Sequence, residues 1–204
     1  MPSRNILKID VPDSYYHLYA RGRGRQKVYR DHEDYVAFLS LFHRYLSISA
    51  VTDSTGRAYA HMRTQIELLT YCLMPNHFHI LVYQRDSGAM TRLMRSVMSS
   101  YTRYYNLKYE SSGPIFESTY KASRVSDDNY LLHISRYIHL NPADWDMYDY
   151  SSYQYYRDDN HPEWLQPERI LELFKSRDTY MKFVKDYEEN KLLLDSIKHE
   201  LADY

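Results

Sequence analysis

Hydrophobic residues follow two different periods along this chain, and the two periods predict an alternation of strands and helices. Strands are expected where apolar and aromatic residues alternate or run together between turn residues, over 14–20, 64–74, 77–84 and 114–125. In the third of these segments the alternation places Phe78, Ile80 and Val82 on one face. Residues 77 and 79 therefore project from the opposite face.

Helical spacing of apolar residues fills the stretches between these strands. Helices are expected from residue 31 or 32 to about 46, over 88–109, and from residue 127 or 128 to Pro142. The third helix has an acidic residue at its start, which is typical of an N-terminal cap. Its residues Leu131, Ile134 and Ile138 form an apolar stripe that should face the sheet.

The resulting order, β-α-β-β-α-β-α, predicts an α+β fold: a ferredoxin-like antiparallel sheet with helices packed on one face. An aromatic, irregular segment is expected over 144–165, and two polar helices near 166–176 and 178–201. We therefore expect a domain over residues 1–156 and an acidic helical extension over 157–204. Trp145 and Trp164 are expected to pin this extension onto the domain.

Composition excludes several classes of protein. The 204 residues are 44% hydrophobic and carry a net charge of −1, which excludes a disordered chain. No apolar run approaches the length of a membrane span, and the N-terminus lacks the layout of a signal peptide. The single cysteine, Cys72, excludes an internal disulfide and is expected to be a buried apolar residue. We expect a cytoplasmic protein.

The small net charge conceals an asymmetry between the two parts of the chain. Residues 1–125 carry 17 Lys and Arg against 10 Asp and Glu, a balance of +7. Residues 126–204 carry 9 against 17, a balance of −8. A basic body can attract phosphate, whereas an acidic C-terminal part can keep the chain soluble or compete with nucleic acid for the basic surface.

Two histidines form the first candidate site. His77 and His79 project from one face of the predicted strand, and two neighbouring imidazoles are half of a site for a divalent metal. A metal needs at least a third ligand. Without one, the pair indicates only two half-exposed strand histidines.

The second candidate lies on the third predicted helix. Tyr137 and Asn141 are four residues apart, and so lie on one helix face, and the amide oxygen of Asn is a plausible ligand for a hard metal ion. The alternative is a purely structural role, in which Tyr137 packs in the apolar side of an amphipathic helix and Asn141 lies near its C-terminus. His133, one turn before Tyr137, is expected to be structural, and His139 to pack away from the Tyr137 stripe.

A mixture of cations and tyrosines forms the third candidate. Basic residues cluster at 21–30, and others share the predicted helix 88–109 with Tyr101, Tyr104, Tyr105 and Tyr109. Such mixtures suit single-stranded nucleic acid, which is held by stacking and by phosphate contacts. The alternative is an ordinary solvated helix face.

These three features, in this order, resemble the HUH single-strand transposases, and most closely the REP-associated tyrosine transposases. The resemblance rests on residues 74–82 (MPNHFHILV), which hold two histidines around a hydrophobic residue, and on residues 137–142 (YIHLNP), which hold a Tyr followed four residues later by Asn. Flanking stretches also match, at 16–22 (YHLYARG), 104–108 (YYNLK), 113–116 (GPIF) and 151–153 (SSY). It covers roughly residues 14–156, whereas residues 157–204 match no motif.

The resemblance implies a metal-dependent DNA transposase. It implies Mg²⁺ or Mn²⁺ held by His77, His79 and Asn141, with Tyr137 attacking the scissile phosphate and forming a 5′-phosphotyrosine link. It also implies DNA with imperfect hairpins as the partner, and we expect a monomer. The basic side chains that we expect to contact DNA are Arg21, Arg23, Arg25, Arg95, Arg103 and Lys121.

Three other functions remain open at this level. A domesticated protein would bind hairpin DNA without cutting it. A metal-dependent hydrolase would use His77 and His79 to activate water, and would leave no protein–DNA adduct. An RNA-binding protein of similar fold would need exposed aromatic residues on the sheet, where the two histidines are expected instead.

Overall fold

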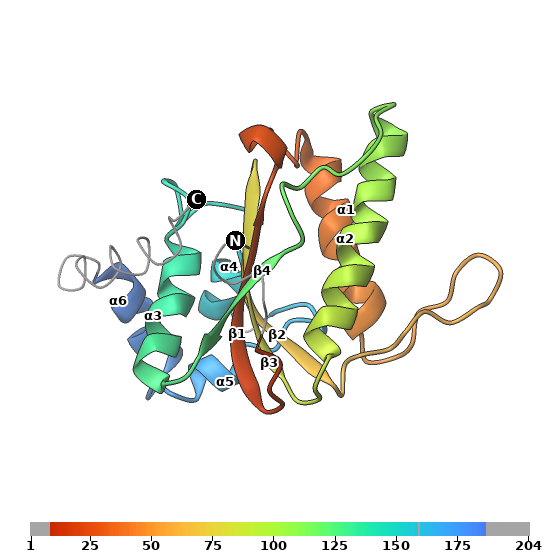
Figure 1. Ribbon diagram of the computed structural model, residues 1–204. Coiled ribbons are helices and arrows are strands. Elements are labelled where there is room, and N and C mark those ends of the chain that lie inside the picture. Colours follow the sequence, from red (N-terminus) through yellow and green to blue (C-terminus); the bar gives the residue numbers. More distant parts are fainter. Residues whose placement is uncertain (1–8, 159, 187–204) are drawn as a thin grey trace.

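A four-stranded antiparallel sheet organises the molecule, for which a computed structural model describes residues 9–158 and 160–186 (Figure 1). The strands are β1 (Ser14–Arg21), β2 (Ile66–Met74), β3 (His77–Gln84) and β4 (Lys121–Val125). Their order is β2-β3-β1-β4, and every neighbouring pair is antiparallel. The predicted ferredoxin-like α+β fold is confirmed.

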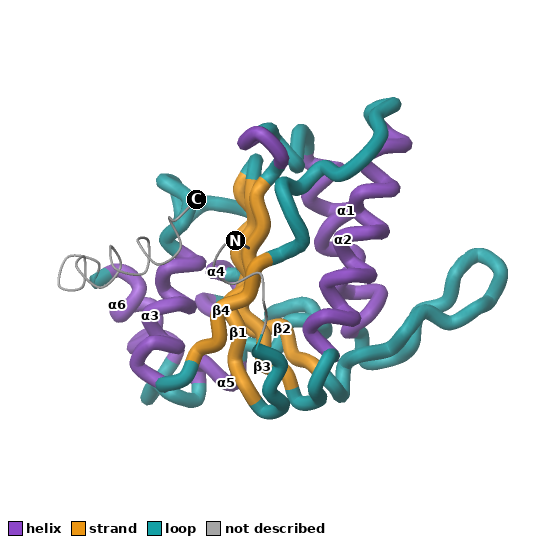
Figure 2. The backbone as a smooth tube through the Cα atoms, in the orientation of Figure 1, coloured by secondary structure: helices purple, strands orange, loops and turns teal. Residues whose placement is uncertain are grey.

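Helices cover both faces of this sheet, so the expectation of helices on one face is wrong (Figures 1 and 2). The first face carries α1 (His32–Leu46) and α2 (Ala89–Lys108), which pack against each other. The second face carries α3 (Asp128–His139). It is joined there by α4 (Tyr153–Arg157), α5 (Glu168–Leu171) and α6 (Arg177–Lys185).

The strands themselves require two helical layers, because nearly every residue of β1, β2 and β3 is buried. Side chains of one parity, such as Phe78, join a core with α1 and α2. Side chains of the other parity, such as Tyr19 and Cys72, join a second core with α3. A sheet that is apolar on both faces must be covered on both. The long apolar runs of these strands therefore indicate a layer of helices on each face.

The predicted helix starts are confirmed, together with their caps. Asp31 accepts a hydrogen bond from the backbone N–H of Asp34 at 3.1 Å, and Asp127 accepts one from that of Tyr130 at 2.8 Å. Each cap satisfies a backbone donor that the first turn of a helix leaves without an intrahelical partner. The apolar stripe of α3 joins the second core together with Tyr137, so packing against the sheet sets the direction of this side chain.

The predicted strand 114–125 is only partly confirmed, because regular pairing begins at Lys121. Before that point the chain meets the end of β1 at an isolated bridge between Gly22 and Phe116, where the Glu117 N–H donates to the Arg21 carbonyl at 2.9 Å. Side chains of α2 hold this stretch instead: Asn106 Nδ2 donates to the Gly113 carbonyl at 3.0 Å, and the Thr91 and Tyr120 hydroxyls lie 3.1 Å apart. The segment therefore forms a wall beside α2.

The C-terminal segments differ in length from the expectation. The region 144–165 is mostly irregular but contains α4, and α5 spans Glu168–Leu171 instead of the predicted 166–176. The next helix begins soon afterwards, because the Ser176 side chain accepts a hydrogen bond from the Thr179 N–H and caps the start of α6. The predicted helix over 178–201, and the extension over 157–204 to which it belongs, continue beyond residue 186, outside the described residues.

The described part of the extension contributes to both cores: Trp164 and Leu165 join the core under α1 and α2, and Ile170 and Tyr180 join the core of the α3 face. The Gln166 N–H donates to the Leu68 carbonyl at 2.8 Å, which fixes the chain along β2. Trp164 packs near Phe42 and Tyr71, in agreement with the anchoring role predicted for it. Trp145 contacts Tyr153 edge-on, which is a contact inside the first 156 residues and does not anchor the extension. No helix within the described ranges is both long and apolar enough to cross a bilayer.

Candidate active site

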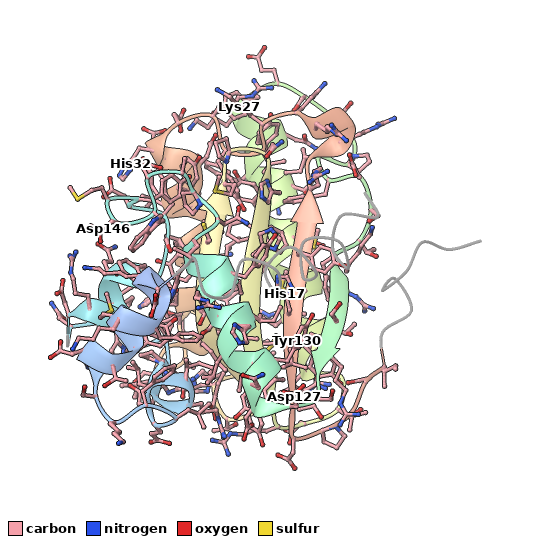
Figure 3. The ribbon with its side chains drawn as sticks, turned by 90° about the vertical axis from the view of Figure 1, so that its left-hand side faces the viewer. His17, Lys27, His32, Asp127, Tyr130 and Asp146 are labelled. Atoms are coloured by element: carbon pink, nitrogen blue, oxygen red, sulfur yellow. The ribbon has the colours of Figure 1, made fainter. Side chains whose placement is uncertain are left out.

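The second face of the sheet brings together the histidines of β3 and the tyrosine of α3. His77 and His79 project toward α3, whereas Phe78 between them is fully buried in the core below α1 and α2. Tyr137 reaches the same place from α3, with its ring centroid 5.3 Å from that of His79. Figure 3 looks onto this side of the molecule, with α3 in front of the sheet. The structure therefore brings His77, His79, Tyr137 and Asn141 together on this face.

His77 lies between two amide oxygens. Its Nδ1 is 2.7 Å from Asn76 Oδ1, and its Nε2 is 3.2 Å from Asn141 Oδ1. An amide oxygen only accepts hydrogen bonds, and a neutral imidazole carries a single N–H. The shorter contact favours the proton on Nδ1, and in that tautomer Nε2 and Asn141 Oδ1 face each other as two acceptors.

His79 is more deeply buried and has a different neighbour. Its Nδ1 lies 2.9 Å from Nε2 of His17, a residue of β1 whose ring stacks on that of His79 with centroids 5.0 Å apart. Burial lowers the pKa of His77 to about 4 and lowers that of His79 well below its ordinary value. Both imidazoles are therefore neutral at physiological pH, the form that ligates metals.

Tyr137 is 9% exposed and keeps its proton at neutral pH. Burial raises the pKa of the Tyr137 hydroxyl to about 12, although the side chain of Asn141 and the positive charge of Arg21 act in the opposite direction. A nucleophilic role therefore requires that the phenol lose its proton during the reaction.

The donor set suits a divalent cation. Two neutral imidazoles and one amide oxygen are ordinary metal ligands, and the opposed acceptors His77 Nε2 and Asn141 Oδ1 are satisfied when a cation lies between them. Within residues 9–158 and 160–186, no group of three His, Cys, Asp or Glu side chains forms a metal cluster. The amide of Asn141 is thus essential to this candidate site.

Three other residues singled out in the sequence are structural. The Arg136 guanidinium donates to His133 Nδ1 at 2.7 Å, away from the Tyr137 hydroxyl. His139 is fully buried between the hydroxyls of Ser152 and Tyr180, at 2.9 and 2.8 Å. Cys72 is also fully buried, and burial raises the pKa of its thiol, so it is inert as a nucleophile.

The expected DNA-binding cations fall into two groups. Arg21 of β1 is paired with His77 of β3. Lys121 of β4 is paired with Tyr19 of β1, which is itself paired with His79 of β3. Arg21 and Lys121 therefore lie across the sheet from the two histidines. Arg23 and Arg25 belong to the exposed 3₁₀ turn that follows β1. Arg95 and Arg103 are on α2, where they line a groove of about 800 Å³ against residues 113–120.

Gly22 holds the basic turn against the site. Its N–H donates to the Asn76 carbonyl at 2.7 Å, and a Cβ at this position would lie 2.2 Å from the Gln26 carbonyl oxygen. Only glycine fits this approach, so Gly22 ties Arg21 and Arg23 to the loop that precedes His77.

The tyrosines of α2 do not form a stacking surface for nucleic acid. Tyr101 donates to the Val28 carbonyl at 2.6 Å, and Tyr109 donates to the buried carboxylate of Asp34 at 2.7 Å. Lys108 also bonds Asp34, at 3.0 Å. These side chains connect α2 with α1, so the tyrosines do not provide the stacking surface considered from the sequence, whereas Arg95 and Arg103 on the same helix remain exposed.

His17 and Asn76 are the site residues that the sequence analysis missed. His17 lies two residues before Tyr19, so strand alternation places it on the same face, but its contact with His79 depends on the pairing of β1 with β3. Asn76 belongs to the turn before β3, and its role depends on the rotamer of a turn residue.

Comparison with solved structures found proteins that are similar to this chain. A solved structure described as a REP-associated tyrosine transposase bound to a REP hairpin is 13% identical, covers 80% of this chain and 92% of that chain, and has a TM-score of 0.57. A putative transposase from Deinococcus radiodurans is 15% identical, covers 68% of this chain and 95% of that chain, and has a TM-score of 0.40.

Sequence comparison gives the family. Comparison with curated proteins found no match. The family model of the IS200-like transposases matches residues 10–141, which include both histidines, Tyr137 and Asn141. The chain belongs to the IS200-like transposase family.

Proposed function

We propose that this transposase cuts and rejoins single-stranded DNA beside hairpins, with Tyr137 as the nucleophile. The observation that carries the proposal is the position of Tyr137. Its ring centroid is 5.3 Å from that of His79, and it lies on the same face of the sheet as the contact between His77 and Asn141. One chain provides all of these groups. We therefore propose a monomer whose site forms in cis.

His77, His79 and Asn141 would hold a divalent cation, Mg²⁺ or Mn²⁺. The opposed acceptors and the neutral imidazoles support this assignment. When bound, such a cation polarises the scissile phosphate and offsets the charge that develops on it.

Tyr137 carries the covalent step. Its phenolic oxygen forms a bond to phosphorus as its proton leaves, and the bond from phosphorus to the 3′ oxygen breaks. The 3′ oxygen takes a proton and becomes a free 3′-OH, and the protein retains the 5′ end as a phosphotyrosine. Because the link keeps the energy of the phosphodiester, another 3′-OH can reverse the step and join a new end.

Arg21 is placed to help Tyr137 lose its proton. The hydroxyl has a pKa raised by burial to about 12, and the charge of Arg21 acts against that rise. A cation beside the phenol favours both the phenolate and the approach of a phosphate. We propose that Arg21 positions the scissile phosphate beside Tyr137.

Hairpin DNA is the proposed partner. The related structure bound to a REP hairpin supports this class of ligand, although its 13% identity does not identify the bases. Arg23 and Arg25 follow the end of β1 next to the site, and Lys121 lies on β4, where it is paired with Tyr19 of β1. We propose that these cations contact the phosphates of the strand to be cut.

The test uses labelled hairpin DNA with single-stranded flanks, taken from the sequence next to the protein's own gene. Protein and DNA are incubated with Mn²⁺ or Mg²⁺ and separated on a denaturing gel. The wild type should form a metal-dependent adduct that survives denaturation. Tyr137→Phe should lose it by at least a factor of about 100, because the nucleophile is absent. Tyr130→Phe, on the same helix, is the matched control and should react like the wild type.

The alternatives give different gels. Cleavage without an adduct, unchanged in Tyr137→Phe, would identify a hydrolase that uses water. Binding with neither adduct nor cleavage, on several hairpins, would identify a hairpin-binding protein that has lost the activity.

A further inference from the structure

His17 lies at the centre of the site and has no role in the chemistry described above. It is fully buried on β1, and its ring stacks on that of His79 at an interplanar angle of 22°. Figure 3 shows its position on the sheet beside α3. A histidine is an expensive choice for a core position that needs only an apolar ring, because burying its polar nitrogens costs free energy unless they are paired.

The contact between His17 and His79 contains one hydrogen bond that can run in either direction. The two nitrogens, His17 Nε2 and His79 Nδ1, are 2.9 Å apart, so one of them carries the proton between them. If His17 donates, the single proton of neutral His79 lies on its Nε2, and His79 has no free lone pair there. If His79 donates, its Nε2 is an open ligand.

The position of the ring proton differs in His77, because the neighbouring side chain offers only an acceptor to Nδ1. Asn76 Oδ1 accepts from His77 Nδ1 at 2.7 Å, which leaves the Nε2 lone pair of His77 open. The far nitrogen of His17, Nδ1, has no hydrogen-bond partner within the described residues, so nothing there fixes the direction of its bond to His79. A ligand on His79 Nε2 would fix that direction.

We propose that His17 is a positioning residue for the metal centre, which accepts the Nδ1 proton of His79 and so presents His79 Nε2 to the cation. This inference rests on the proposed function, since it assumes that His79 ligates a metal. It assigns to His17 the part that Asn76 has for His77. Outer hydrogen bonds of this kind orient metal-binding imidazoles, and their loss weakens binding roughly 10–100-fold.

Two substitutions separate acceptance of the proton from filling of the space. His17→Phe keeps a flat ring against His79 but removes the acceptor. His17→Gln provides an amide oxygen near the position of Nε2. Mn²⁺ affinity is measured by titration calorimetry without DNA, and hairpin affinity is measured without metal. Thermal melting shows whether each variant is folded.

We expect His17→Phe to bind Mn²⁺ roughly 10–100-fold more weakly, and His17→Gln to stay within a few-fold of the wild type. Metal-free hairpin binding should be unchanged in both. Wild-type affinity in His17→Phe, with adduct formation intact, would overturn the role of His17 and leave the proposed function standing. An equal loss in two folded variants would also overturn it. A wild type that binds no Mn²⁺ would remove the metal centre itself, and this inference with it.

A measurement on the wild type covers the case in which His17→Phe does not fold. Long-range ¹H–¹⁵N NMR distinguishes protonated from unprotonated ring nitrogens, and Zn²⁺ is a diamagnetic probe of the site. With Zn²⁺ bound, Nδ1 of His79 should carry the proton and Nε2 should be the ligand. A proton on Nε2 of His79 would contradict the proposal.

Discussion

With the proton of His77 on Nδ1, its Nε2 and Asn141 Oδ1 face each other at 3.2 Å as two acceptors. Such a pair is unfavourable by itself, because two acceptors at this distance share no donor. A cation bound between the two atoms would be coordinated by both of them and would remove this cost. The amide oxygen of Asn141, more than either histidine, therefore decides whether this group of side chains is a metal site.

This reasoning predicts different results for two substitutions of Asn141. Asn141→Asp keeps an oxygen in the same place and should keep Mn²⁺ binding. Asn141→Leu has a similar volume but no ligand atom, and should weaken Mn²⁺ binding by a factor of at least about 10. Calorimetric titration with Mn²⁺ measures both affinities. Equal affinities in the wild type and Asn141→Leu would show that the amide is no ligand.

Four residues of the site could be predicted from the sequence, and two could not. Strand alternation placed His77 and His79 on one face, and the resemblance to known motifs connected them with Tyr137 and Asn141. His17 was missed because its contact with His79 depends on strand register, which no local pattern specifies here. The alternation of residues shows which face a side chain occupies, but not which neighbour it meets.

At the scale of the helix, α6 holds α3 in place. The Arg136 guanidinium donates to the Phe183 carbonyl at 3.2 Å, near the C-terminal end of α6, where a positive charge is favourable. The Tyr180 hydroxyl meets His139 at 2.8 Å and Ser135 at 3.3 Å. These contacts lie within one turn of Tyr137, so α6 contributes to the position of Tyr137.

Removing the Tyr180 hydroxyl should therefore destabilise the protein. Tyr180→Phe keeps the ring but leaves His139 without one partner, which should lower the free energy of unfolding by about 1–2 kcal/mol. Tyr29→Phe is the matched control, because the buried Tyr29 hydroxyl has no partner within the described residues. Its loss should be neutral or stabilising. Urea unfolding of both variants measures the difference, and equal losses would refute this account of the Tyr180 contacts.

The elements that were predicted well have strong local signals at their ends. Asp31 and Asp127 cap α1 and α3, and Pro142 follows the end of α3. The stretch 114–120 has the composition of a strand, but contacts with α2 decide its conformation. Its departure from β1 is a tertiary effect, which strand propensity does not contain.

At the scale of the whole molecule, the sequence established that the first part of the chain is basic, but not where the charge gathers. The structure separates it into the turn Arg23–Arg25 near the site and the groove beside α2. Other cations are neutralised: Lys108 bonds Asp31 and Asp34 at 2.8 and 3.0 Å. The balance of +7 over residues 1–125 therefore overstates the charge available to DNA.

Arg95 and Arg103 are the candidates for contact with a hairpin stem away from the site. They are eight residues apart on α2, a separation of about 12 Å along a helix, and both line the groove. No carboxylate within the described residues forms a salt bridge with either, although Glu117 also lines the groove. An exposed guanidinium without a carboxylate partner binds a phosphate oxygen without the cost of breaking an ion pair.

If each arginine neutralises one phosphate, Arg95→Ala and Arg103→Ala should each weaken hairpin binding and reduce the slope of log K against log salt by about 1. Arg57→Ala is the control, because Arg57 lies in the loop between α1 and β2 that projects from the body in Figure 1. It removes the same charge but should leave the slope unchanged. Equal slopes in all three variants would mean that net charge alone attracts the DNA, and that the groove beside α2 is not part of the binding surface.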